Sequence, residues 1–309
     1  MPSVQALSST RDRVGESPVW SVARQALYWV DIESQRIHCF DWNNRQQSSW
    51  DLPQRVGCIA LSNRGTVVAA METGIFELAL HDAAQVQLHC LATVAHPADG
   101  MRFNDGRCDA QGRFWAGTMV RDMGLASAAG GIYCLDSQGL RGPVLKGYIT
   151  PNGMAFSPDG KTAYLSDSHP SVQTIWKHPF DAGTGQWGTA SPWVDMKPLP
   201  GRPDGAAVDA EGCYWICGND AGQVHRFSPA GELLQSIALP VSKPAMCAFG
   251  GPELRHLLVT SIQPATPAPG FDASLDGAVL VLEPGVQGRA EPLFSQFPAV
   301  SYTHLRAHE

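Results

Sequence analysis

A short strand pattern recurs six times along this chain of 309 residues. Each copy is a run of β-branched, aromatic and small residues next to turn residues. In chain order the copies are ALYWVD (26–31), TVVAAM (66–71), RFWAGT (113–118), TAYLSD (162–167), CYWICG (213–218) and HLLVTS (256–261). Their spacing is roughly 40 to 50 residues, which is the period of four-stranded propeller blades. Six copies at this period predict six blades.

The turns before four of these strands are also alike, because each ends in glycine. They read SNRG (62–65), DAQG (109–112), SPDG (157–160) and DAEG (209–212). Glycine suits such a turn because it adopts positive φ without a steric cost. The alternative, an all-β sandwich with strands every 8 to 12 residues or so, explains neither the longer period nor the matching turns. We therefore predict an all-β fold, a six-bladed β-propeller, as a single domain over residues 1–299.

Composition argues against several classes of partner. The net charge is −7 and no block of Lys or Arg stands out, so neither nucleic acid nor an anionic membrane is expected as a partner. Residues 1–20 lack the basic and apolar regions of a signal peptide, and no apolar run reaches the roughly 18 to 20 residues of a membrane span. The eight cysteines are dispersed without CxxC spacing, which is typical of buried free thiols in a reducing compartment. We expect a cytoplasmic protein with no obligate protein partner.

The glycine turns also provide a register for comparing the blades, because the residues eight positions before the four glycines are equivalent. The register extends to the first repeat, where SVARQ replaces the turn, and approximately to the sixth. In chain order this position holds Glu16, Gly57, Asn104, Asn152, Asp204 and an apolar residue, Ala245 or Met246. Innermost strands surround the central channel of a propeller, so these side chains should converge. Two carboxylates and two amides would form an oxygen-rich site for Ca²⁺, Mg²⁺, Mn²⁺ or Zn²⁺. The alternative is that the Asn-Gly and Asp-Gly pairs simply make turns.

Seven segments, spread from residue 15 to residue 251, form a recognisable series. They are GESPVW (15–20), YWVDI (28–32), RFNDG (102–106), FWAGTM (114–119), PNGMAFSPDGKTAYLSDS (151–168), RPDGAAVDAEGCYW (202–215) and KPAMCAFGG (243–251). In this order they resemble the senescence marker protein (regucalcin) and gluconolactonase family of six-bladed propellers. The motifs are specific for the family and much less specific for a substrate. Residues 300–309 have no counterpart in that family, and this tail is a candidate for non-native sequence.

The resemblance implies a bound cofactor, one divalent metal ion held by Glu16, Asn152 and Asp204. Residues of the same types bind the metal in the family. The resemblance leaves the identity of the ion open among Ca²⁺, Zn²⁺, Mn²⁺, Mg²⁺ and Fe²⁺. It further implies that Asp204 is the catalytic general base, which deprotonates the attacking water.

The resemblance also implies substrate contacts from Arg102 and Asn104. These residues are two apart, so on a strand they face the same side and can bind sugar hydroxyls together. Asp105 should point the other way and serve a structural role. The family carries a further acidic contact just after its GTM motif, and Asp122 is the nearest candidate here. The Ala- and Gly-rich loop 120–130 could cover the channel mouth.

The predicted function is metal-dependent hydrolysis of small aldonolactones, such as gluconolactone or pentonolactones, with the metal polarising the lactone carbonyl. One alternative is a non-enzymatic calcium-binding regulatory protein, although calcium binding alone has no use for the guanidinium of Arg102. Another is a propeller esterase or phosphotriesterase with a different substrate. A serine hydrolase is not expected, because the sequence has no GxSxG motif.

Overall fold

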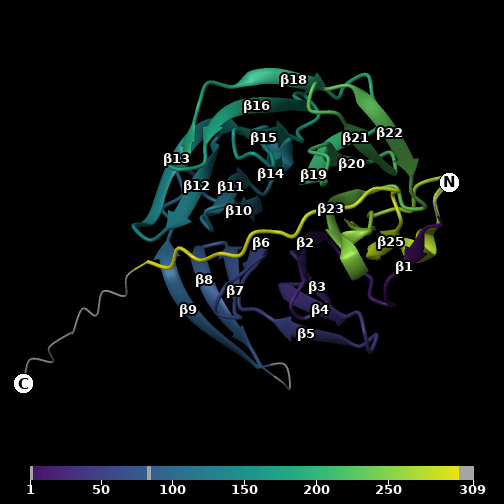
Figure 1. Ribbon diagram of the computed structural model, residues 1–309, viewed down its shortest axis with the longest axis horizontal. Helices are drawn as coiled ribbons and strands as arrows, with labels where there is room; N and C mark the ends of the chain where they lie inside the picture. The colour runs from purple at the N-terminus through teal and green to yellow at the C-terminus, as the bar shows by residue number, and fades with distance from the viewer. Residues whose placement is uncertain (1–2, 82–84, 299–309) are drawn as a thin grey trace, which may run out of the picture.

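The computed structural model describes residues 3–81 and 85–298. These residues form six small antiparallel sheets arranged around a central axis, which confirms the predicted six-bladed β-propeller (Figure 1). The predicted tail, residues 300–309, lies outside the described residues. No described helix has both the length and the apolar character needed to cross a membrane.

In each blade the strands follow one another from the central channel outward. Blade 1 contains β2 (Gly15–Ser21), β3 (Ala26–Asp31), β4 (Arg36–Asp41) and β5 (Gln47–Asp51). Blade 2 contains β6 (Val56–Leu61), β7 (Val67–Met71), β8 (Gly74–Leu80) and β9 (Val86–Thr93). Blade 3 contains β10 (Met101–Cys108), β11 (Phe114–Val120), β12 (Gly130–Asp136) and β13 (Gly139–Tyr148).

Blade 4 contains β14 (Pro151–Phe156), β15 (Thr162–Asp167), β16 (Thr174–Asp181), β17 (Gln186–Trp187) and β18 (Ser191–Asp195). Blade 5 contains β19 (Arg202–Val208), β20 (Tyr214–Asn219), β21 (Gln223–Phe227) and β22 (Leu233–Ala238). Blade 6 contains β23 (Pro244–Gly250), β24 (His256–Ser261), β25 (Leu280–Leu282) and β1 (Gln5–Ala6). Three short 3-10 helices lie in connections, namely η1 (Met123–Leu125), η2 (Pro252–Leu254) and η3 (Ala273–Leu275).

The strand that recurs in the sequence is the second strand of every blade. It is buried on both faces, because the neighbouring blades pack against it, and so it reads as a nearly continuous apolar run. Trp29, Trp115 and Trp215, each near the middle of such a strand, are fully buried. The strongest sequence signal therefore comes from the most buried layer of each blade.

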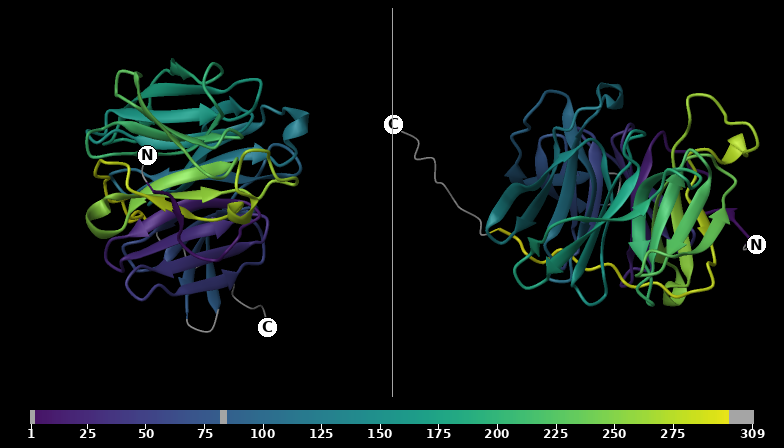
Figure 2. Two further views of the ribbon diagram at one scale, coloured as in Figure 1. Left: turned by 90° about the vertical axis from the view of Figure 1, so that its right-hand side faces the viewer. Right: turned by 90° about the horizontal axis from the view of Figure 1, so that it is seen from above.

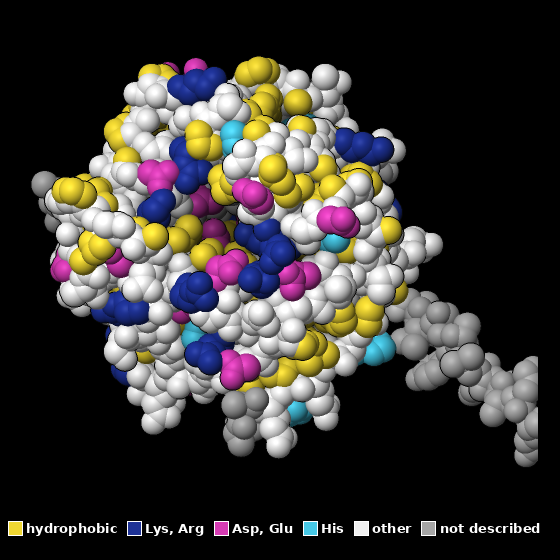
Figure 3. Space-filling model, turned by 180° about the vertical axis from the view of Figure 1, so that it is seen from behind, with side chains coloured by type: hydrophobic (Ala, Val, Ile, Leu, Met, Phe, Trp, Pro, Cys, Tyr) yellow, Lys and Arg dark blue, Asp and Glu magenta, His cyan; other side chains and the backbone are white. Residues whose placement is uncertain are grey.

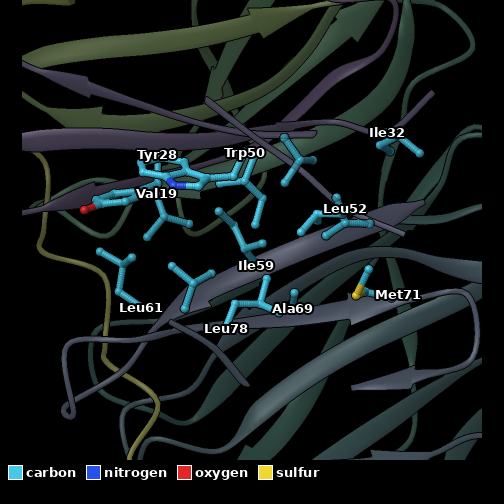
Figure 4. Close-up of a cluster of buried hydrophobic side chains, with 14 of the residues drawn as sticks. Val19, Tyr28, Ile32, Trp50, Leu52, Ile59, Leu61, Ala69, Met71 and Leu78 are labelled. Carbon is cyan, nitrogen blue, oxygen red and sulfur yellow. The ribbon is translucent and has the colours of Figure 1, made fainter. Parts of the chain in front are cut away.

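The hydrophobic core is divided into clusters that lie between neighbouring blades. Figure 4 shows the cluster that joins blades 1 and 2, in which Val19, Tyr28 and Trp50 of blade 1 face Ile59 and Leu78 of blade 2. Because each blade is buried against its neighbours, the ring must close for every face to be covered. The ring closes in blade 6, where the N-terminal strand β1 pairs with β25.

A C-terminal strap, residues 283–298, crosses one face of the propeller (yellow in Figure 1). It forms isolated β-bridges from Gly288 to Asp209 and from Phe294 to Ser62. Phe294 is fully buried under blades 2 and 3. Ser62 and Asp209 directly follow the innermost strands β6 and β19, so the strap covers the face on which the innermost strands end.

The strap also closes the central channel at that face. Glu291 of the strap forms an ion pair with the buried Arg107 of β10, whose guanidinium also donates to the carbonyl of Ala206. Figure 2 (right) shows the strap along one face, while the segments that carry η1 and η3 project from the other. The channel mouth is therefore on the face where the innermost strands begin.

All six innermost strands contain a register shift near their start, each in the pairing with the second strand of the same blade. The shifts lie between Glu16 and Val19, Val56 and Cys58, Phe103 and Gly106, Asn152 and Ala155, Pro203 and Ala206, and Pro244 and Cys247. Such bulges interrupt the alternation of side chains and redirect them locally. The repeat position identified in the sequence falls at this bulge.

All eight cysteines are free thiols, as predicted. Six are buried, whereas Cys90 is exposed and Cys39 is partly exposed. The exposed thiol lies on β9, the outermost strand of blade 2, where one side of the strand faces solvent.

Candidate active site

The repeat position lies at the beginning of the innermost strands, and two of its side chains are in direct contact. Nδ2 of Asn104 donates to Oδ1 of Asn152 at 3.0 Å and to the carbonyl of Pro151 at 3.0 Å. Gly57 occupies the same position in blade 2, where a Cβ would lie 2.3 Å from the carbonyl oxygen of Phe103. A side chain is therefore excluded from blade 2 because β6 and β10 approach too closely.

Three acidic side chains, Glu16, Asp204 and Asp105, influence one another electrostatically in the channel. Burial raises the pKa of Glu16 well above its ordinary value, and the charges of Asp204 and Asp105 raise it further. Burial raises the pKa of Asp204 to about 7, although Arg202 and Asn219 oppose the shift. Burial also raises the pKa of Asp105 to about 6. These carboxylates lack enough donors to offset their desolvation.

Arg102 and Asn104 face the same side of β10, as their spacing predicts. Nη1 of Arg102 donates to Oδ1 of Asn104 at 2.7 Å and to the carbonyl of Phe103 at 2.8 Å. The charge of Arg102 acts to lower the pKa of Glu16, which places the guanidinium near the acidic cluster. Burial lowers the pKa of Arg102 itself. A cation and an amide thus lie beside the carboxylates.

Asp105 connects two blades and also remains close to the site. Its Oδ2 accepts a hydrogen bond from the backbone N–H of Met154 at 2.9 Å, which ties β10 to β14. Its charge also raises the pKa of both Glu16 and Asp204. Simple alternation would send Asp105 away from Asn104, and the bulge between Phe103 and Gly106 breaks that alternation.

Asp122 lies on the surface at the start of loop 120–130. Its Oδ1 accepts a hydrogen bond from the backbone N–H of Gly124 at 3.0 Å and so caps η1. Among the described residues, no hydrogen bond joins Asp122 to Arg102 or Asn104. The loop is exposed, with Leu125 at 66% of full exposure. The substrate-binding role of Asp122 and the covering role of the loop stay predictions.

Two further residues contribute hydrogen bonds to the site, and sequence reasoning missed both. Nδ2 of Asn219 donates to Oδ2 of Asp204 at 2.6 Å. Nδ2 of Asn152 donates to Oγ of Ser168 at 2.5 Å. Ser168 and Asn219 lie where the second strand ends in blades 4 and 5, opposite the first residues of the inner strand. The repeat register used for the inner strands could have identified this second position.

The site is suited to a divalent cation. Glu16, Asn152 and Asp204 supply only oxygen donors, which is the preference of hard cations. Buried Oδ1 atoms of Asp105 and Asn219 have no hydrogen-bond partner in the described chain. Within the same residues, no group of three His, Cys, Asp or Glu side chains is placed to bind a metal ion. The predicted set has two carboxylates, and its third ligand is the amide of Asn152. The donor types and the clustered acidic groups fit the predicted metal.

Fold and site together define a β-propeller whose channel, closed at one end, presents carboxylates, amides and one guanidinium. The chain matches the family described as SMP-30/Gluconolactonase/LRE-like region over residues 14–263. This match covers most of the chain, and the chain belongs to that family.

Curated relatives and solved structures agree with the match. The chain is 40% identical over 287 residues to a 6-deoxy-6-sulfogluconolactonase of Pseudomonas putida, covering 91% of this chain and 95% of the relative. It is 32% identical over 266 residues to a pentonolactonase of Haloferax volcanii, covering 84% and 85%. The crystal structure of a calcium-binding regucalcin from Agrobacterium tumefaciens matches with a TM-score of 0.84 at 28% identity, covering 95% and 98%.

Proposed function

We propose that this protein is a metal-dependent hydrolase of small sugar lactones and that the reaction takes place in the central channel. The observation that carries the proposal is the meeting of two carboxylates that have few hydrogen-bond donors, the partly buried Glu16 and the buried Asp204, with the Arg102–Asn104 pair. Relatives named for lactonase activity support the same reaction class.

In this proposal Glu16, Asn152 and Asp204 hold one divalent cation. When bound, such an ion polarises the lactone carbonyl and stabilises the negative charge that develops on its oxygen. The choice of ion belongs to experiment, since an all-oxygen donor set accepts several.

Substrate binding and proton transfer are carried out by different side chains. Arg102 and Asn104 donate hydrogen bonds to the hydroxyl groups of the sugar. Asp204 accepts a proton from water, and Asn219 keeps its carboxylate oriented through the 2.6 Å hydrogen bond. Water adds to the carbonyl carbon, the ring C–O bond breaks, and the ring oxygen takes up the proton that Asp204 had accepted and leaves as a hydroxyl, which gives the aldonic acid.

The relatives suggest the substrates to test first. A 6-deoxy-6-sulfogluconolactonase at 40% identity and a pentonolactonase at 32% identity place sulfonated hexonolactones and pentonolactones beside gluconolactone in the panel. The calcium-binding regucalcin structure keeps a purely calcium-binding role as the second candidate. That role needs neither Arg102 nor a proton acceptor beside the substrate.

The deciding experiment is a pH-indicator assay of lactone hydrolysis by wild type, Asp204→Asn and Asp195→Asn. Asp195 is an exposed carboxylate at the end of β18 and provides the matched control. We expect turnover above the spontaneous rate in wild type and in Asp195→Asn, and a loss of roughly 10³-fold in Asp204→Asn. Calcium binding without turnover of any lactone would contradict the enzyme proposal and favour the binding role.

A further inference from the structure

A second row of side chains lies two residues before the repeat position, at the very start of the innermost strands. Blade 6 fits the same register, because Pro244 pairs with Ser261 as Pro151 pairs with Asp167. From blade 1 to blade 6 the row holds Val14, Arg55, Arg102, Thr150, Arg202 and Lys243. Four of the six are cations, in a chain whose net charge is −7. The row is therefore a local concentration of positive charge.

The cations of this row differ in how fully they are neutralised. Arg55 forms ion pairs with Glu33 at 3.1 Å and Glu72 at 3.3 Å, and Glu72 also lies 3.7 Å from Arg121. On this side two cations face two carboxylates, and the charges balance.

On the side of blades 5 and 6, two cations share one carboxylate. Nε of Arg202 lies 2.6 Å from Oδ2 of Asp220, and Nζ of Lys243 contacts Oδ1 of the same residue. Nη2 of Arg202 has no protein partner in the described part of the chain, and the ammonium group of Lys243 has no hydrogen-bond partner there other than Asp220. Two cations thus form direct ion pairs with only one carboxylate and keep several unused N–H donors, although the charge of Arg202 also acts on the nearby Asp204.

The cluster borders the candidate active site. Arg202 is paired in register with Asn219, which donates to Asp204. Nη1 of Arg202 donates to the carbonyl of Ser168 at 3.0 Å, and Ser168 in turn accepts from Asn152. The Arg202 and Lys243 side chains are 20% and 29% exposed, so a ligand can reach them while their hydration is already reduced. Figure 3 shows Lys, Arg, Asp and Glu side chains gathered around a hollow near the middle of this face.

We propose that Arg202 and Lys243 form a subsite for an anionic group on the lactone, on the part of the substrate that faces the channel mouth. The inference rests on the proposed function and adds a substrate class to it, namely aldonolactones that bear a sulfonate or a phosphate. Such groups present several oxygens, which match the unused donors of a guanidinium and an ammonium. Asp220 holds both cations in place and limits the excess charge.

The test compares kcat/KM for 6-deoxy-6-sulfogluconolactone, 6-phosphogluconolactone and uncharged gluconolactone. Wild type should prefer the charged lactones, and the preference should weaken as salt is added. Lys243→Gln should lower the ratio of charged to uncharged kcat/KM by roughly 10- to 100-fold. Lys146→Gln, which removes the same charge from the exposed outer strand β13, should leave the ratio unchanged. The charged lactone with the larger kcat/KM relative to gluconolactone shows which anionic group the subsite prefers.

Asp220→Asn provides a second test, because it should change the ratio of charged to uncharged kcat/KM in the opposite direction. It removes the shared anion, so the charged-to-uncharged ratio should rise about threefold or more. Equal wild-type rates for charged and uncharged lactones, or a ratio that neither variant changes, would overturn the subsite. Failure to hydrolyse any lactone would instead overturn the proposed function, so the two failures are distinguishable.

Discussion

Two sets of acidic side chains in this propeller differ in how many hydrogen-bond donors surround their carboxylates. At the strap face, Asp209 accepts from the backbone N–H groups of Glu211 and Cys213, from Nε1 of Trp215 and from Nε of Arg226, at 2.8 to 3.0 Å. In the channel, Asp204 accepts one hydrogen bond from a side chain, that of Asn219, and Glu16 accepts one from the adjacent Ser17. Asp204 is buried and Glu16 is partly buried, but neither has its charge compensated by hydrogen bonds as fully as Asp209.

Asp109 repeats the arrangement of Asp209 one hundred residues earlier, in the equivalent turn of blade 3. Its two oxygens accept from the backbone of Gln111 and Arg113 and from the side chains of Arg113 and Trp115. A fully satisfied buried charge fixes a turn to the second strand of its blade. An unsatisfied one costs stability unless a ligand supplies what is missing. The comparison separates carboxylates that hold the fold from carboxylates that we propose bind a ligand.

The largest expected effect concerns activity at Asp204. Asp204→Asn should lower kcat/KM for lactone hydrolysis by about 10³-fold, because it removes both a proton acceptor and an ionic metal ligand. Its melting temperature without metal should equal or exceed that of wild type, since the neutral amide is less costly to bury. Differential scanning calorimetry beside the rate assay checks both parts. A variant that is both inactive and strongly destabilised would place Asp204 with the structural group.

The converse prediction, a loss of stability with little loss of activity, concerns Asp209. Asp209→Asn should lower the free energy of unfolding by about 3 kcal/mol, because it leaves Arg226 and two backbone N–H groups poorly paired in a buried site. The folded fraction should keep kcat/KM within a few-fold of wild type. Glu211→Gln, which changes the exposed partner of Arg226, is the control and should cost less than about 1 kcal/mol. Denaturant unfolding measures these differences.

A smaller effect should appear as a pH dependence of the metal-free protein. The pKa values of Glu16 and Asp204 are raised in the folded state, so the folded protein binds more protons than the unfolded chain. Stability should therefore fall as the pH rises from about 4, the unfolded value, to about 7, by roughly 1 kcal/mol per pH unit from Asp204 alone. Asp204→Asn should flatten this dependence, and Asp209→Asn should keep it. A metal-free wild type whose stability rises over this range would contradict the assignment of unsatisfied channel carboxylates.

Much of the fold could be predicted from the sequence, because the second strand of each blade is buried on both faces and has a strong apolar pattern. The repeat position could also be predicted, since it lies a constant distance before a glycine turn. Its occupants Asn104 and Asn152 are indeed hydrogen-bonded to each other.

The missed features depend on contacts between residues that are distant in the sequence, and only the position of Asn219 and Ser168 could have been found from the repeat register. Asn219 reaches Asp204 through strand pairing within blade 5, and Glu291 pairs with Arg107 from 184 residues away in the sequence. The direction of Asp105 depends on a bulge, which reverses the expectation from strict alternation. Asp122 lies in an exposed loop, where sequence spacing does not determine the position of a side chain.

The most direct test of the account is metal removal and reloading in wild type, Asp204→Asn and Asp209→Asn, with lactone hydrolysis as the readout. Chelator should abolish turnover by wild type and by folded Asp209→Asn, and at least one of Ca²⁺, Mg²⁺, Mn²⁺, Fe²⁺ or Zn²⁺ should restore it in both. Asp204→Asn should remain inactive with every ion. Full activity after exhaustive chelation, or restored activity in Asp204→Asn, would contradict the proposal that the channel carboxylates await a catalytic metal.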